Sequence, residues 1–210
     1  MRVILGSASP RRKELMGMLG IPFDVMVSDC EEVISDTHPD KVTESLAVQK
    51  AMAVANKIVA EKSSVEECFV IGSDTVVSVD NEILGKPKDK EDARKMIEKI
   101  SGRTHVVYTG VAIVAVSAPG EIVLKTSFAE GTRVSVAELS QREIADYISM
   151  PECDDKAGAY AIQGMFGKYI EGIRGDYNTV VGLPVHRLYE ELKRILSEKG
   201  LNALKCIHIC

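Results

Sequence analysis

A small set of charged residues in this sequence has no obvious structural task, because they stand in expected loops or near the ends of expected helices and strands. The carboxylates are Glu32 and Asp74, and the cations are Arg11, Arg12, Lys50, Lys86 and Lys156. Paired carboxylates can hold Mg²⁺ or Mn²⁺. Cations can bind phosphate oxygens and neutralise the charge that develops on them. Together these residue types are typical of metal-assisted phosphoryl chemistry.

Asp74 is the residue around which the rest of the chain is expected to be organised. It follows an apolar run at 69–71 and the pair Gly72-Ser73, and it precedes a β-branched run at 75–79. We expect the first run to be a buried strand that stops before Asp74, which would place this carboxylate where ligands of open α/β sheets collect. The alternative is an Asx turn between two strands, which this stretch alone favours. The other charged residues shift the balance toward a functional carboxylate.

The start of the chain predicts an anion-binding arrangement. A strand at 2–6 leads into a polar loop containing Ser7, and Ser9 can cap a helix whose first residue is Pro10. Backbone N–H groups and the helix dipole at such a terminus favour phosphate. Arg11 and Arg12 lie in the first turn, where the dipole disfavours cations, so a bound anion would compensate them. A solvated basic turn is the alternative interpretation.

The remaining periodicity predicts one α/β domain covering residues 1–210, without repeats or linkers; if it has two lobes, the chain crosses between them. Expected strands lie at 23–28, 82–85, 104–116, 122–136, 168–173 and 179–181, with a hairpin turn at 80–81; expected helices lie at 41–61, 89–102, 140–149 and 184–200. Lys50 lies beside the apolar stripe of the helix at 41–61, where its stem can cover apolar surface, so its position alone assigns no role. Small residues surround Gln163, which allows close approach of the backbone to a ligand.

Composition excludes several classes of protein. The net charge of −5 argues against nucleic acid as a partner, so a polyanionic ligand would need a local basic cluster. No apolar run approaches the roughly 18 residues of a membrane span, and the first apolar segment is too short for a signal peptide. The five cysteines include no C-x-x-C pair and are expected to be reduced thiols. We expect a cytoplasmic protein without a membrane partner.

Several catalytic motifs are absent from the sequence. It contains no G-x-x-x-x-G-K-[ST], no G-x-G-x-x-G after a strand, no H-E-x-x-H and no G-x-S-x-G. Their absence disfavours P-loop hydrolysis, dinucleotide redox chemistry, zinc proteolysis and acyl transfer.

Seven short motifs, in order, resemble the Maf family of nucleoside triphosphate pyrophosphatases over residues 2–196. They are SASPRR (7–12), GSDTV (72–76), GKP (85–87), SGRTH (101–105), DKAGAY (155–160), IQG (162–164) and VGLP (181–184). The resemblance implies an elongated mixed β-sheet with flanking helices, in two lobes around a central cleft, related to the inosine triphosphate pyrophosphatases. It also implies a homodimer that hydrolyses a nucleoside triphosphate to the monophosphate and pyrophosphate with a divalent cation.

Carried over by position, the resemblance gives most of the candidate residues a role. It makes Asp74 the proton acceptor that activates water, and Glu32, Lys50 and Lys86 match the family's other catalytic positions. Glu32 and Asp74 are also the expected ligands of Mg²⁺ or Mn²⁺. Arg11, Thr75 and Gln163 match positions tied to substrate choice; Ser7, Ser9, Arg12 and Lys156 complete the expected substrate-binding set.

The choice of substrate rests on the residue after Asp74. Thr75 and the IQG motif look like the branch that acts on dTTP and UTP, whereas the sister branch that acts on 7-methyl-GTP usually has Gln there. A non-catalytic nucleotide-binding regulator of cell division is a further alternative, because the family is associated with inhibition of septum formation. The segment 177–180 departs from the family, which usually sets Asn directly before Val-Val-Gly, and this puts Asn178 in doubt as a ligand.

Overall fold

A computed structural model describes residues 2–27, 30–61, 67–118 and 120–198. The expected end of the last helix at Gly200 and the thiols of Cys206 and Cys210 lie outside these residues, as does the predicted strand end at Ser28. Within the described part of the chain, no helix is long and apolar enough to cross a membrane.

In these residues seven strands form one mixed sheet, in the order β2-β1-β3-β5-β6-β7, with β4 paired to β3. Neighbouring strands are parallel at β2-β1-β3 and antiparallel in the rest of the sheet. The strands are β1 (Arg2–Leu5), β2 (Asp24–Val25), β3 (Cys68–Val79), β4 (Glu82–Leu84), β5 (Thr104–Val116), β6 (Ile122–Val136) and β7 (Ile170–Arg174).

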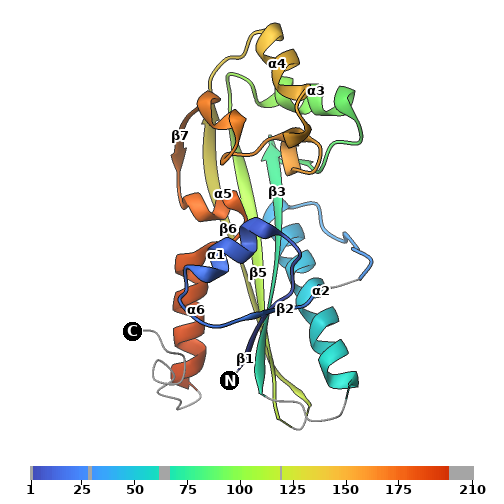
Figure 1. Cartoon of the computed structure of the whole chain (residues 1–210), viewed down its shortest axis with the longest axis vertical. Coiled ribbons are helices and arrows are strands. Elements are labelled where there is room, and N and C mark those ends of the chain that lie inside the picture. Colours follow the sequence, from blue (N-terminus) through green and yellow to red (C-terminus); the bar gives the residue numbers. More distant parts are fainter. Residues whose placement is uncertain (1, 28–29, 62–66, 119, 199–210) are drawn as a thin grey trace.

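Helices cover both faces of the sheet and one of its ends, as expected (Figure 1). They are α1 (Pro10–Gly17), α2 (Pro39–Ala60), α3 (Lys90–Ile100), α4 (Gln141–Ile148), α5 (Tyr177–Val181) and α6 (Val185–Glu198). One face packs under α2, and the other packs under α1 and α6. The upper lobe in Figure 1 has its own core, which α3 and α4 build with the far ends of β3, β5 and β6. The long strands therefore run through both lobes.

Two glycines bring α2 unusually close to the sheet. A Cβ on Gly72 would lie 2.3 Å from the carbonyl oxygen of Ala47, and one on Gly110 would lie 2.2 Å from that of Thr43. Only glycine allows such contact between the backbone of a strand and a helix. The contact fixes the rotation of α2, and it sets the next turn of the helix, which carries Lys50, above β3.

The structure corrects the expected end of the strand before Asp74. β3 is continuous from Cys68 to Val79, so Asp74 lies in the middle of a strand and there is no Asx turn. The whole segment pairs with β5, and Asp74 is opposite Gly110. Gly72 and Ser73 are extended because they pair with Ala112 and Val111 of β5. In addition, α2 packs on Gly72, and the Ser73 hydroxyl donates to the carbonyl of Gly182 on the other face, at 3.0 Å.

A second correction concerns residues 179–181, which form the end of helix α5 instead of a strand. The run Thr-Val-Val has high β propensity, but Asp176 caps the helix by accepting from the backbone N–H of Thr179 at 2.8 Å. The expected strand at 23–28 is reduced to Asp24–Val25, and β7 begins two residues later than expected, at Ile170.

Local signals predicted most of the other elements. Ser9 caps its helix as expected, and Asp89 and Ser140 cap the helices that begin at the expected positions, the last with a complete capping box. Asp80 and Asn81 form the hairpin turn with φ of 52° and 65°. The two longest strands begin and end at the predicted residues.

Candidate active site

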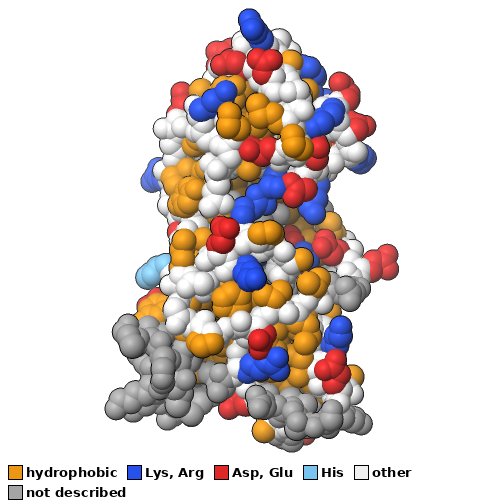
Figure 2. All heavy atoms as spheres, viewed as in Figure 1, with side chains coloured by type: hydrophobic (Ala, Val, Ile, Leu, Met, Phe, Trp, Pro, Cys, Tyr) orange, Lys and Arg blue, Asp and Glu red, His pale blue; other side chains and the backbone are white. Residues whose placement is uncertain are grey.

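A cleft of about 870 Å³ contains every residue that the sequence predicted for the site. The predicted residues that line it are Ser7, Ser9, Arg11, Arg12, Glu32, Lys50, Asp74, Thr75, Lys86, Lys156 and Gln163. They come from the β1–α1 connection, the first turn of α1, the segment before α2, α2 itself, β3, the residues after β4 and the segment 155–163. Figure 2 shows Lys and Arg side chains gathered at the constriction between the two lobes.

The cleft opens where the edge of β3 loses its neighbours. β1 pairs with residues 68–71 of β3 and β4 pairs with residues 77–79, so in the described chain residues 72–76 have no strand on this edge. Successive residues of a strand direct their main-chain groups to opposite edges. The carbonyl of Ile71 accepts from the backbone N–H of Gly6 at the β1 edge, at 2.8 Å. The N–H and C=O groups of Ser73 and Thr75 therefore point into this gap.

Asp74, Lys50 and Glu32 form one group of charges in the cleft. The Lys50 ammonium makes an ion pair with the Asp74 carboxylate and another with Glu32, with 2.9 Å between Nζ and Oε1. The side chains of Lys50 and Asp74 are only 17% and 12% exposed, whereas that of Glu32 is 48% exposed. The amine of Lys50 is therefore engaged by both carboxylates, and its role is not limited to covering apolar surface.

The chemistry of this donor set fits the expected divalent cation. Both acidic groups offer only oxygen atoms, and Mg²⁺ is usually bound by one or two carboxylates together with substrate phosphates and water. Among the described residues, no group of three or more His, Cys, Asp or Glu side chains could hold a metal ion by itself. Glu32 and Asp74 are thus suited to a metal that arrives with a polyphosphate, as opposed to a permanently enclosed one.

Arg12 connects three elements in the wall of the cleft. Its guanidinium donates to the carbonyl of Gly182 and to the hydroxyl of Thr75, both at 3.0 Å, and to the hydroxyl of Ser7 at 3.4 Å. Burial lowers the pKa of Arg12, and the nearby Asp74 carboxylate opposes that shift. These acceptors stabilise the Arg12 cation, which the helix dipole disfavours, so no bound anion is required at this residue.

Two of the other cations are available to bind an anion. In the described part of the chain, the side chains of Arg11 and Lys86 have no hydrogen-bond or ion-pair partner. Lys156 pairs with Asp155, and this contact is the main reason that the pKa of the Asp155 carboxyl is lowered. Gln163 is exposed at the cleft. Phosphate groups in the cleft would therefore find unpaired positive charge close to the Asp74 group.

Sequence reasoning assigned no role to Tyr160, which is the only aromatic residue that lines the cleft in the described chain. Its hydroxyl lies 2.7 Å from Nε2 of His105, which is 1% exposed. Burial lowers the pKa of His105 to about 4, so the imidazole is neutral at pH 7. Both residues occur in motifs that carried the family resemblance, and that was the available signal.

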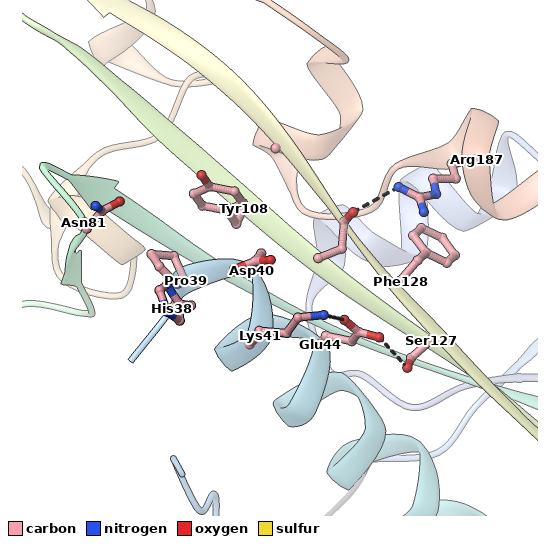
Figure 3. Close-up of a pocket in the computed structure, with 12 residues that line it drawn as sticks. His38, Pro39, Asp40, Lys41, Glu44, Asn81, Tyr108, Ser127, Phe128 and Arg187 are labelled. Atoms are coloured by element: carbon pink, nitrogen blue, oxygen red, sulfur yellow. Dashed lines mark hydrogen bonds and ion pairs between the residues drawn. The ribbon is translucent and has the colours of Figure 1, made fainter. Parts of the chain in front are cut away.

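A second hollow, of about 600 Å³, lies beside the N-terminus of α2, over β5 and β6 (Figure 3). Three of its charged side chains, those of Lys41, Glu44 and Arg187, have local partners. Lys41 pairs with Glu44 at 3.3 Å, Glu44 accepts from the hydroxyl of Ser127 at 2.8 Å, and Arg187 pairs with Glu130 at 2.7 Å. It holds none of the predicted residues, so the cleft is the candidate active site.

Comparisons with known proteins identify the family of the chain. The family model for Maf, described as Maf-like protein, matches residues 2–195. The chain is 48% identical over 200 residues to the dTTP/UTP pyrophosphatase of Agathobacter rectalis, covering 92% of this chain and 97% of that protein. It is 45% identical to the dTTP/UTP pyrophosphatase of Lachnoclostridium phytofermentans, covering 92% and 94%, and 46% identical to that of Bacillus anthracis, covering 92% and 95%.

Among solved structures, the Ham1 protein of Staphylococcus aureus matches with a TM-score of 0.48 and 13% identity, covering 92% of this chain and 98% of that one. The match over nearly the whole sequence, together with relatives of such high identity, establishes that this chain belongs to the Maf-like protein family.

Proposed function

We propose that the protein hydrolyses dTTP and UTP to the corresponding monophosphate and pyrophosphate. One observation carries the proposal: the cleft unites the Asp74–Lys50–Glu32 group with free cations, in a chain 45–48% identical to proteins named dTTP/UTP pyrophosphatases. The carboxylate suits the activation of water, and the cations suit a chain of phosphates.

In the proposed reaction, Asp74 accepts a proton from the water that attacks the α-phosphorus. Lys50 holds Asp74 in place from α2, and the β3 strand supplies a rigid base beneath it. Negative charge develops on the bridging oxygen and on the leaving pyrophosphate. Arg11, Lys86 and Lys156 neutralise it from the rim of the cleft. Mg²⁺ or Mn²⁺ at Glu32 and Asp74 would add Lewis-acid stabilisation of the phosphate oxygens.

Recognition of the base is assigned to the segment that ends in Gln163. A glutamine amide offers an acceptor and two donors, which match the N3–H and O4 edge of uracil or thymine. Because the amide can rotate, it discriminates poorly alone. Thr75 and the size of the pocket supply the remaining selectivity.

Pyrophosphate release from a panel of triphosphates tests the proposal. We expect kcat/KM for UTP and dTTP to exceed the values for dATP, dGTP and 7-methyl-GTP on the same preparation. A higher value for 7-methyl-GTP would move the protein to the alternative branch, and binding without release would favour the regulator. The proposal also includes a cytoplasmic homodimer, and light scattering coupled to gel filtration would show whether it dimerises.

A further inference from the structure

A chain of hydroxyl groups runs from the cleft into the core. Thr75 lines the cleft, and its neighbour in the β3–β5 register is Thr109, which is 0% exposed and does not line the cleft. The Oγ1 atoms of these two residues are 2.9 Å apart. Oγ1 of Thr109 also lies 2.7 Å from the carbonyl oxygen of Thr179, in α5.

The direction of every hydrogen bond in this chain is determined by its inner end. A hydroxyl has one hydrogen to donate and two lone pairs, whereas a carbonyl can only accept. Thr109 must therefore donate its single hydrogen to Thr179. Between the two threonine hydroxyls, Thr75 is then the donor and Thr109 the acceptor.

This leaves Thr75 without a hydrogen for a ligand. Its only hydroxyl hydrogen is directed at Thr109, and one of its lone pairs accepts from the Arg12 guanidinium at 3.0 Å. The second lone pair remains, so Thr75 can offer the cleft an acceptor and nothing else. If the chain of bonds ended at Thr75, the hydroxyl could rotate and would serve donors and acceptors alike.

We propose that Thr109 is a positioning residue for substrate choice: it fixes the polarity of Thr75, which then selects a nucleotide that presents an N–H or O–H donor to it. The inference rests on the proposed function, since it names the kind of group, a hydrogen-bond donor, that this site recognises in its triphosphate. Two groups of dTTP have that chemistry, namely the N3–H of the base and the 3′-hydroxyl of the sugar. At N3 cytosine has a lone pair instead of a hydrogen, so dCTP would place an acceptor opposite the acceptor of Thr75.

The test compares kcat/KM ratios for dTTP over two analogues, in the wild type and in Thr109→Val. The analogues are dCTP, which turns the N3 donor into an acceptor, and 3′-fluoro-dTTP, in which a weak acceptor replaces the sugar hydroxyl. Valine keeps the shape of threonine but accepts no hydrogen bond, so Thr75 becomes able to donate. We expect one of the two ratios to fall about tenfold, which is the size expected for one uncharged hydrogen bond. A fall with dCTP assigns the donor to the base, and a fall with 3′-fluoro-dTTP assigns it to the sugar.

Two variants separate this effect from a structural one. Thr109→Ser keeps the hydroxyl and should keep both ratios. Thr132→Val makes the same change at a residue that is also 0% exposed and donates to the carbonyl of Asp176 at 2.9 Å, but has no link to Thr75. It should leave both ratios unchanged even if it lowers the melting temperature. Unchanged ratios in Thr109→Val would overturn the inference.

Two further measurements cover the cases in which that comparison fails. If Thr109→Val does not fold, Thr75→Val removes the acceptor itself and should lower the same ratio, while Thr75→Ser should preserve it; equal ratios in both would refute the inference. If the wild type releases no pyrophosphate from dTTP, the proposed hydrolysis is wrong. The ratios of Kd, measured by calorimetry with the same triphosphates, then decide the polarity of Thr75 independently.

Discussion

Replacing Asp74 by asparagine separates the proposed chemistry from the packing around it. Asparagine keeps the size of the side chain and one oxygen acceptor, but it loses the charge and the ability to accept a proton from water. Lys50 then loses one of its two carboxylate partners and retains Glu32 at 2.9 Å. The change should therefore impair turnover far more than folding.

The two magnitudes can be worked out separately. Loss of a general base typically costs about 10²–10⁴-fold in rate, which corresponds to about 3–5 kcal/mol of activation free energy. Breaking a buried ion pair outright costs about 3–5 kcal/mol of stability. Here Glu32 still neutralises Lys50 and is half solvated, so we expect a loss of about 1–2 kcal/mol in the free energy of unfolding. For a chain of this length that is about 2–8 °C in Tm.

The assay combines pyrophosphate release, calorimetric binding of UTP and thermal unfolding. Measured without added divalent cation, Asp74→Asn should bind UTP with little change in Kd; with the cation present, its turnover should fall at least a hundredfold. Asp155→Asn is the matched control, because Asp155 also lines the cleft and also pairs with a lysine, but has no assigned part in activating water. Turnover near the wild-type rate in Asp74→Asn would refute the assignment of the base.

The remaining predictions concern two arginines, two glycines and one buried histidine. Arg11→Ala should lower kcat/KM for UTP at least tenfold with Tm nearly unchanged. Arg12→Ala should lower Tm by several degrees, because the Arg12 side chain hydrogen-bonds to three elements. A large fall in Tm for Arg11→Ala together with an unchanged Tm for Arg12→Ala would contradict the site. Gly72→Ala should lower the free energy of unfolding by about 3 kcal/mol or more, because its Cβ would lie 2.3 Å from a helix carbonyl oxygen. Gly17→Ala should raise it by about 0.5–1 kcal/mol, because nothing lies within 4 Å of a Cβ there. Urea unfolding measures both. The pKa of His105 is about 4 in the fold against about 6.5 in the unfolded chain. Between these pH values the unfolded chain binds more protons, so the free energy of unfolding should fall by about 2 kcal/mol from pH 7 to pH 5. His105→Gln should lack that part of the decline; the same decline in variant and wild type would show that the histidine is already protonated in the fold.

Elements whose ends are determined by local chemistry were predictable from the sequence. Ser140 and its capping box begin α4 whatever the rest of the fold does, and the turn at 80–81 follows from two residues that tolerate positive φ. Gly72 and Ser73 gave the opposite result, because their extended geometry depends on pairing with Ala112 and Val111 of β5, far away in the sequence. Propensity alone could not reveal either contact.

The candidate site shows the same division. The residue types suggested phosphoryl chemistry, but their roles came from the resemblance and not from spacing. Lys50 and Asp74 are 24 residues apart and meet only because glycines let α2 lie on the sheet. The pairing of Thr75 with Thr109 requires the register of β3 against β5, which no local pattern specifies.

The open edge of β3 at residues 72–76 has a consequence for experiments that replace side chains. The N–H and C=O groups of Thr75, which lines the cleft, point to this open edge and belong to the polypeptide itself, so every substitution except proline retains them. An alanine scan of the cleft would leave these donors and acceptors in place to hold water or a phosphate oxygen. The availability of these main-chain groups thus depends on which segments of the strands pair, and not on the identity of the side chains. Only changes that close the gap, or that replace an amide by an ester in the main chain, would remove it.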